Sequence, residues 1–228
     1  MYHETVGYII HQRDFRNSSI IIEFFSQDFG LLHILAKGIK KNKQLKTQLH
    51  YFSLLKIQFF GKSNLKTLTS INLLKQTNYK NIIHKTAGLY FNELLHFSLL
   101  EQDKAESLFL NYQKNLLNIG HDKLSPVLRS FEKEILKYNG FELSHDSSIE
   151  DDCWLGFDQH MTLSKVNIQS KRLCMNSDLK QFLMGKINNI DTHKRINNLM
   201  QHAINLSINH KRLVSREMLK ALTSDKIG

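Results

Sequence analysis

Seven basic residues near the N-terminus have the type and spacing of a phosphate-binding surface: Arg13, Arg16, Lys37, Lys40, Lys41, Lys43 and Lys46. Between Asp28 and Glu93 the chain has eleven lysines and no carboxylate. Lysine and arginine side chains that neutralise phosphates release the counterions condensed on a nucleic acid, and this release drives sequence-independent affinity. Because a lysine is a point charge with little preference among bases, the pattern predicts binding of a polyanion with weak sequence specificity.

The positive charge belongs to the N-terminal third of the chain. Residues 1–80 carry 12 basic and 4 acidic residues, whereas residues 81–228 carry 19 and 17. The 228-residue chain has a net charge of +10, and 41% of its residues are hydrophobic. That apolar fraction is sufficient for a core, so the basic segment should be folded. A clustered solubility charge is the alternative, but protein surfaces usually intersperse both signs.

The elements that must position these cations read as short β-strands separated by turns: Thr5–His11, Ser19–Phe25, Leu31–Ala36, Phe52–Phe60 and Leu65–Leu74. Five such strands predict an OB-fold barrel. The basic residues then fall in the loops after the first and third strands, which can lie along one groove and form a phosphate track. Four aromatic residues are candidate base-stacking platforms, although burial in the barrel core is the commoner role: Phe15, Phe29, Tyr51 and Phe60.

From about residue 79 the hydrophobic period becomes helical. It predicts helices over these ranges: Asn81–Leu100, Ala105–Ile119, Pro126–Tyr138, Asp178–Ile187 and Thr192–Ile208. Ser125 is the expected N-cap of the third helix, and Ser215 can cap a last one. Residues 141–176 lose the period and read as an irregular insert, with short strands at Met161–Leu163 and Lys165–Ile168. We therefore expect an α+β protein, with an OB-fold domain at 1–78 and a helical domain at 79–228.

No catalytic constellation stands out in the sequence, which favours a binding protein over an enzyme. Gly61-Lys62-Ser63 lacks the glycine that a P-loop requires five residues earlier, because that position is Lys56. His145 and His160 flank Cys153, but zinc ligands usually come in closely spaced pairs, so we predict no metal site and no cofactor. Both cysteines, Cys153 and Cys174, are expected to be free thiols.

Arg129 lies in the first turn of the helix that Pro126 opens. An arginine at this end opposes the helix dipole. Glu132 and Lys133 can pair with it or repel it at helical spacing, so an ordinary surface ion pair is one interpretation. The other is an anchor for a carboxylate of a partner, which the guanidinium can bind with two parallel hydrogen bonds.

Several short runs, in this order, resemble those of the bacterial DNA repair family RecO: Gly7–His11, Ala36–Gly38, Gly88–Leu95, Leu128–Glu132 and Ser215–Glu217. The likeness covers nearly the whole chain, and Gly88–Leu95 is its most specific part. It implies an N-terminal OB-fold followed by a helical domain with a small zinc-finger-like insert. Some relatives carry four zinc cysteines in this insert, and this chain does not.

The resemblance also implies a function. The family binds single- and double-stranded DNA, anneals complementary strands and works with RecR to load RecA onto DNA coated by the single-stranded DNA-binding protein SSB. The arginine of the Leu-Arg-x-Phe-Glu run, here Arg129, helps to hold the acidic C-terminal tail of SSB. We accordingly expect a recombination mediator that is monomeric alone, cytoplasmic and nucleoid-associated, with no signal peptide, no membrane span and no membrane partner.

Two other classes of function remain open. A general RNA-binding OB-fold protein would use the same lysines, since they bind phosphates and not sugars, but it would not need the helical domain. A metal-dependent nuclease would need carboxylates grouped near the basic groove. The gap between Asp28 and Glu93 argues against such a group, although folding can bring later acidic residues near.

Overall fold

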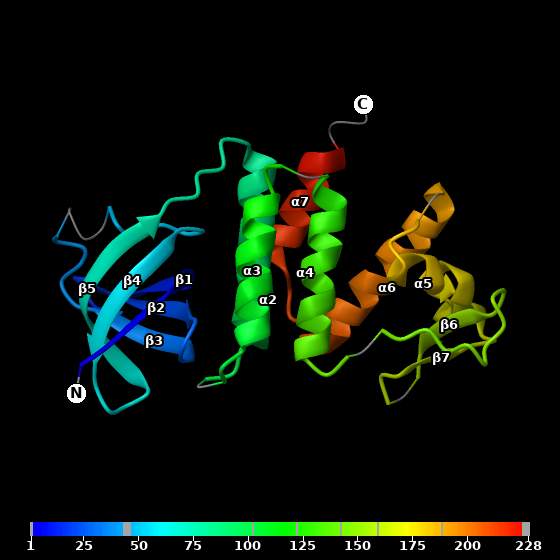
Figure 1. Cartoon of the computed structure of the whole chain (residues 1–228), viewed down its shortest axis with the longest axis horizontal. Coiled ribbons are helices and arrows are strands. Elements are labelled where there is room, and N and C mark those ends of the chain that lie inside the picture. The colour runs from blue at the N-terminus through cyan, green and yellow to red at the C-terminus, as the bar shows by residue number, and fades with distance from the viewer. Residues whose placement is uncertain are drawn as a thin grey trace. The chain divides into compact units, whose positions relative to one another are not determined.

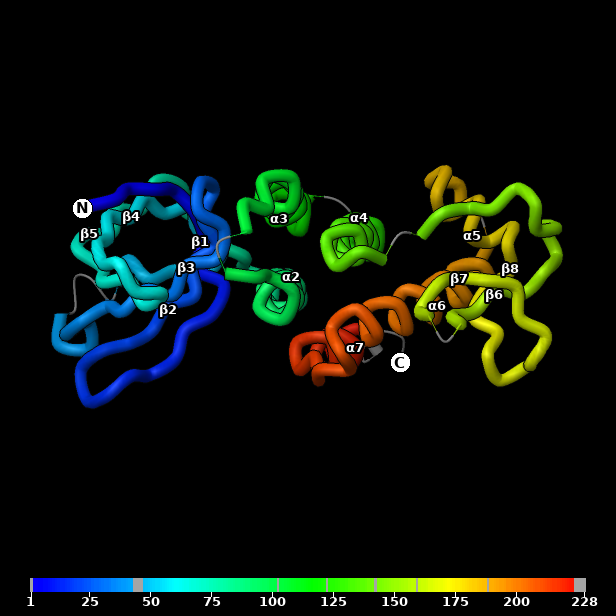
Figure 2. The backbone as a smooth tube through the Cα atoms, turned by 90° about the horizontal axis from the view of Figure 1, so that it is seen from below, coloured from blue at the N-terminus to red at the C-terminus, as the bar shows by residue number. Residues whose placement is uncertain are grey.

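The computed structural model describes residues 2–42, 47–101, 103–121, 123–141, 143–158, 160–187 and 189–224. The chain divides into two compact units, and the division falls inside a helix. The first unit comprises residues 1–131 and 212–228, and the second comprises residues 132–211. Figures 1 and 2 together label the strands and α-helices of both. The second unit is thus inserted between two parts of the first.

Five strands close into a barrel in the first unit: β1 (Tyr2–Phe15), β2 (Ser19–Ser26), β3 (Gly30–Ala36), β4 (Leu54–Phe60) and β5 (Leu65–Lys75). Their order around the barrel is β1-β2-β3-β5-β4, with β3 and β5 parallel and every other pair antiparallel. Figure 2 shows the strands as a ring. This closed five-stranded barrel followed by helices confirms the predicted fold class.

Alternating apolar residues of the strands fill the barrel. Its core includes Ile9, Phe24, Ile34, Leu55 and Phe59, all at most 2% exposed. Phe29 and Tyr51 pack against this core, as predicted for barrel aromatics. Phe60 is different, because it is 39% exposed and contacts Tyr2 with the ring centroids 5.6 Å apart. The expectation of burial is therefore wrong for Phe60, which follows an inward-facing residue and points to the opposite side of its strand.

Three helices and the first half of a fourth complete the first unit: α2 (Ile82–Ser98), α3 (Glu106–Asn118), α7 (Val214–Ser224) and the start of α4 (Leu124–Tyr138). An aromatic layer joins α3 to the barrel. Tyr8 lies 5.2 Å from Tyr112 and 5.8 Å from Phe109, and Phe25 lies 5.3 Å from Phe109, measured between ring centroids. These rings bury large apolar surfaces and fix the helix against β1 and β2.

Three residues of the Gly88–Leu95 run in α2 make contacts that account for their residue type: Gly88, Asn92 and Glu93. A Cβ on Gly88 would lie 2.7 Å from the Phe52 ring, so glycine permits a close approach of the helix to the barrel. The Asn92 amide is buried, donates to the Ile9 carbonyl at 3.5 Å and accepts from the Tyr112 hydroxyl at 2.5 Å. Glu93 accepts hydrogen bonds from the backbone N–H groups of Val214 and Ser215 at 2.9 and 3.0 Å.

Glu93 therefore caps the N-terminus of α7, a role that the sequence had suggested for Ser215. Ser215 lies inside the first turn, and its hydroxyl donates to Glu93. The carboxylate satisfies two backbone donors that a helix start leaves unpaired, and its charge suits the positive end of the helix dipole. The predicted cap Ser125 is wrong as well, because α4 begins at Leu124 and already includes Ser125.

The second unit contains the remainder of α4, a small sheet and two further helices, α5 (Asn176–Leu183) and α6 (Ile190–Ser207). The sheet has the order β7-β6-β8, formed by β7 (Leu163–Lys165), β6 (Trp154–Phe157) and β8 (Cys174–Met175). A 3₁₀ turn, η1, spans Gln169–Lys171. The sequence placed two strands near residues 161–168, but the structure has one there and adds β6 and β8.

None of the helices in the described residues is both long enough and apolar enough to span a membrane.

Candidate nucleic-acid interface

Two turns at one end of the barrel bring the predicted cations together. The turn after β1 contains Arg16 and Ser18, and the turn after β3 contains Lys37 and Lys40. The Lys40 N–H donates to the Ser18 carbonyl at 3.1 Å, and the Gly38 N–H donates to the Ser19 hydroxyl at 3.4 Å. The turns lie together because β2 pairs with both β1 and β3, so the loops at that end converge.

The second turn is held in place by one buried residue. Ile39 is 2% exposed and belongs to the barrel core, while Lys37 and Lys41 on either side are exposed. Gly38 has φ +66°, a left-handed conformation that glycine adopts without steric cost. The backbone reversal thus directs the apolar side chain inward and the neighbouring ammonium groups into solvent.

The basic side chains at this end of the barrel differ in exposure and in ion pairing. Arg13, Arg16, Lys37 and Lys41 are exposed. The predicted loop position is wrong for Arg13, because β1 continues to Phe15. Lys40 is half-buried, and its Nζ lies 2.8 Å from an Asp14 carboxylate oxygen. We name the four exposed residues the cation cluster. Lys43 and Lys46 lie outside the described residues.

Although residues 29–92 contain no carboxylate, the fold brings carboxylates from β1 close to two lysines of this stretch. Asp14 comes from β1, outside the acid-free stretch, and compensates Lys40. Glu4, also from β1, lies 2.6 Å from Lys56 on the neighbouring strand. Within the described residues, the cation cluster is the part of the predicted phosphate track for which no salt bridge to a carboxylate is found.

One predicted stacking residue accompanies the cluster. Phe15 is half-buried at the end of β1, and the Arg16 guanidinium lies over its ring, 5.3 Å from the centroid. Arg16 has φ +53°, which turns the chain sharply after β1. An arginine on an aromatic face is a cation–π contact that holds the guanidinium at the surface.

Arg129, the predicted anchor for a carboxylate, is half-buried in the first half of α4. Val127 and Phe131, two residues before and after it, are buried in the core. Their position places Arg129 away from the fully buried side of the helix. Because α4 begins at Leu124, Arg129 lies in its second turn and not, as predicted, in the first.

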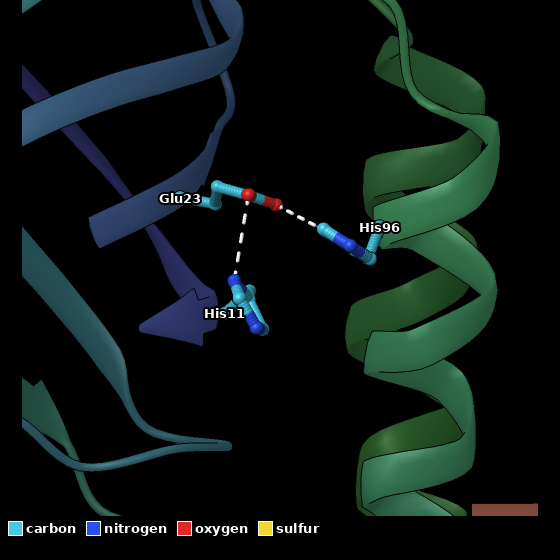
Figure 3. A group of neighbouring side chains, drawn as sticks. All are labelled: His11, Glu23 and His96. Carbon is cyan, nitrogen blue, oxygen red and sulfur yellow. Dashed lines mark hydrogen bonds and ion pairs between the residues drawn. The ribbon is translucent and has the colours of Figure 1, made fainter. Parts of the chain in front are cut away.

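A second polar group lies between the barrel and α2, and sequence reasoning missed it. Glu23 of β2 is 8% exposed, and its Oε2 lies 2.6 Å from Nδ1 of His96 on α2. Its Oε1 lies 3.4 Å from Nδ1 of His11 on β1 (Figure 3). Burial acts to raise the pKa of Glu23, but the hydrogen bond with His96 and the nearby imidazoles outweigh it and lower that pKa. The same hydrogen bond raises the pKa of His96 against the effect of burial.

Asp178 is a buried carboxylate of the second unit. The Asp178 side chain accepts from Arg195 Nε and Nη2 at 2.6 and 2.9 Å, from the Thr192 hydroxyl at 2.7 Å and from the Met175 N–H at 2.9 Å. Burial opposes ionisation of Asp178, but these hydrogen bonds and the Arg195 charge lower its pKa overall. Nearby, burial raises the pKa of the Cys174 thiol to about 12.

The histidines that flank Cys153 do not converge with it. Among the described residues, Cys153 groups with Glu150 and Asp152, which are both exposed, and the group includes neither His145 nor His160. The Cys153 thiol donates to a Glu150 oxygen at 3.7 Å.

Comparison with known proteins decides the family. A family model described as "Recombination protein O N terminal" matches residues 1–77, and one described as "Recombination protein O C terminal" matches residues 79–153. The chain belongs to the RecO family of DNA repair proteins. The first match covers the barrel, and the second covers α2, α3 and α4.

Curated relatives named DNA repair protein RecO agree with this assignment. The chain is 26% identical to the RecO protein of Idiomarina loihiensis over 93% of this chain and 95% of that protein. It is 24% identical to that of Actinobacillus pleuropneumoniae serotype 5b over 97% of this chain and 96% of the relative. The Haemophilus influenzae protein is 31% identical over 59% of this chain and 58% of its own length.

Proposed function

We propose that this protein is a non-catalytic mediator of DNA repair and homologous recombination. It binds single- and double-stranded DNA, anneals complementary strands and, with RecR, helps to load RecA onto single-stranded DNA coated by SSB. The observation that carries the proposal is the cation cluster on the barrel of a RecO-family chain. Three exposed cations on two adjoining turns, together with Arg13 near the end of β1, suit a phosphate backbone.

Annealing by such a surface requires no bond-making by the protein. Two DNA strands repel each other through their phosphates, and this repulsion is screened over about 10 Å at 0.1 M salt. A basic surface that binds both strands reduces the repulsion and raises their local concentration. Contacts from lysine and arginine to phosphates carry no sequence information, so strand pairing itself supplies the sequence specificity.

The first test is charge reversal within the cluster. Changing Lys37 and Lys41 to Glu should weaken binding to single-stranded DNA strongly and flatten its salt dependence. Each phosphate contact contributes about 0.7 to the slope of log affinity against log salt, so two lost contacts should reduce the slope by about 1.4. Fluorescence anisotropy across a salt series measures both quantities, and a strand-annealing assay follows the activity.

Lys62→Glu is a control that matches the charge change of the single variant Lys37→Glu. Lys62 is exposed in the β4–β5 turn, beside the start of β1, whereas the cation cluster lies at the end of β1. This variant alters the net charge of the same barrel at its opposite end. Equal loss of affinity in both variants would show a general charge effect and remove the cluster from the DNA site.

The second test concerns the SSB tail. Arg129→Ala should weaken binding of an acidic C-terminal SSB peptide and leave binding of naked DNA largely intact. Loss of a charge-assisted contact to a carboxylate costs about 1.5–3 kcal/mol, a weakening of roughly 10- to 150-fold. Calorimetric titration measures this effect, with Lys133→Ala on the same helix as the control. Equal peptide affinity for wild type and Arg129→Ala would remove Arg129 from the proposed site.

Competition separates this proposal from a general RNA-binding role. A mediator should bind SSB-coated single-stranded DNA at least as well as naked DNA, because it contacts the SSB tail as well as phosphates. Equal preference for RNA and naked DNA, together with exclusion from SSB-coated DNA, would favour the RNA-binding alternative.

A further inference from the structure

The group of His11, Glu23 and His96 contains the side chains of a metal site, although the sequence predicts none. One carboxylate and two imidazoles converge from three elements, β1, β2 and α2 (Figure 3). Their ligand atoms all lie within 4.8 Å of one another. The residues are far apart in the sequence, which is why no closely spaced ligand pair revealed them.

A β-bulge places His11 in this group. Ile9 is opposite Phe24 and both belong to the barrel core, but the next direct pair is His11 with Glu23, so Ile10 is an extra residue. With strict alternation His11 would share the inward side of Ile9. The extra residue reverses this, and His11 lies on the same side of the sheet as Glu23.

The carboxylate at the centre is buried, and a hydrogen bond within this group is present at one of its two oxygens. Glu23 Oε2 has a short hydrogen bond to His96, but the 3.4 Å approach of His11 to Oε1 is not aligned as a hydrogen bond. His11 Nδ1 is itself a buried atom without a hydrogen-bond partner. Buried polar atoms are nearly always paired, because leaving one unsatisfied costs about 1–3 kcal/mol. A cation between these atoms would satisfy both.

We propose that His11, Glu23 and His96 bind a divalent transition-metal ion, Zn²⁺, which fastens β1 and β2 to α2. Two imidazoles and a carboxylate form a ligand set that suits Zn²⁺ and not the oxygen-preferring Mg²⁺ or Ca²⁺. The His11 and His96 side chains are 40% and 31% exposed, so an ion can enter from solvent and keep a water as its fourth ligand.

The ligand atoms lie within 4.8 Å of one another, so side-chain rotations can bring them to the separations of a zinc site. Zinc–nitrogen and zinc–oxygen bonds of about 2.0–2.2 Å place neighbouring ligands of a tetrahedral site about 3.3 Å apart. The contact between His11 and Glu23 already has this length, at 3.4 Å, and the 2.6 Å contact between His96 and Glu23 must open slightly. His96 must also carry its proton on Nε2, which leaves Nδ1 free to bind the metal.

His33 provides a matched control among the neighbouring histidines. It is opposite Glu23 across β2 and β3 and therefore lies on the same side of the sheet. Its Nε2 is 3.2 Å from Glu101 instead, and it is not one of the converging ligands. A His33→Gln variant therefore removes an imidazole from this surface but leaves the proposed site complete.

The test uses the full chain without an affinity tag, stripped of metal by a chelator. The Cys153→Ser background removes the thiol that groups with Glu150 and Asp152. Zn²⁺ is titrated against a chromophoric competing chelator, and Co²⁺ serves as the spectroscopic probe of coordination. We expect one Zn²⁺ per chain and a higher midpoint of thermal unfolding when Zn²⁺ is present, because the ion binds only the folded state.

Loss of a residue that only supports a metal ligand lowers metal affinity by about 10- to 100-fold. His11→Gln and His96→Gln remove a ligand itself, so each should lower the Zn²⁺ affinity by more than this. His33→Gln should retain the affinity of the parent. These variants alter half-exposed side chains, and circular dichroism verifies that each is folded. Unchanged affinity in both ligand variants, loss of all binding in Cys153→Ser alone, or equal losses in His33→Gln and the ligand variants would overturn the proposal.

Discussion

Glu23 in the first unit and Asp178 in the second are buried carboxylates that are stabilised in different ways. Asp178 in the second unit has an arginine, a hydroxyl and a backbone N–H as partners. Glu23 in the first unit has one well-formed hydrogen bond, from an imidazole. Arginine stays charged at all relevant pH values, whereas histidine changes charge near neutrality. The first arrangement suits a permanent structural link, and the second leaves room for a ligand.

The largest expected loss of stability comes from breaking the ion pair between Asp178 and Arg195. Asp178→Asn leaves Arg195 without its partner charge and should reduce the free energy of unfolding of the second unit by about 3 kcal/mol. This is the lower end of the range for a broken buried pair, because the Arg195 side chain is 28% exposed. Trp154, the only tryptophan of the chain, lies in β6, so its fluorescence during denaturation reports on the second unit. A loss below about 1 kcal/mol would contradict this account.

The matching substitution in the first unit should cost less. Glu23→Gln keeps an amide oxygen that can accept from His96, so we expect a loss of about 1–2 kcal/mol in metal-free buffer. Hydrogen exchange of peptides from β1 and α2 measures the local effect, and peptides from α6 provide an internal control. If this variant destabilises its unit as much as Asp178→Asn does, the distinction between the two carboxylates fails.

The smallest effect is the pH dependence of Asp178 under mild conditions. The folded-state pKa of Asp178 lies below the ordinary value of 3.8. Its contribution to stability is therefore complete well above 3.8 and is lost as the pH falls through the folded value. The difference in stability between wild type and Asp178→Asn, followed by Trp154 fluorescence, should stay constant from pH 7 to about 5 and shrink below pH 4. A difference that already shrinks between pH 7 and 6 would point to another titrating group.

Local signals were sufficient to predict the barrel and most helices. β-Branched runs between turn residues identified β1 to β5, and apolar residues at helical spacing identified α2, α3 and α6. Strands as short as β6, β7 and β8 have no measurable period, so the small sheet could not be predicted reliably. The cap of α7 was also missed, because its acceptor, Glu93, belongs to a distant helix.

The candidate sites show the same limit. Exposure of Lys37 and Lys41 followed from their position after a strand, but pairing of Lys40 with Asp14 depends on the register of β1 and on how the two turns meet. The His11–Glu23 pair depends on a bulge that moves one side chain to the other side of the sheet. Charge patterns along the sequence therefore predict where cations gather, and tertiary structure decides which of them stay available.

The return of the chain to the first unit has a consequence for biosynthesis. Residues 132–211 separate α2 from α7, whose first turn is capped by Glu93. A ribosome must therefore synthesise the entire second unit before the first can acquire its last helix. Until α7 is synthesised, the surface of α2 that it contacts in the folded protein is not covered by it. We infer that the nascent barrel and its early helices wait in an incomplete state, and that the final residues of the chain complete the domain made first.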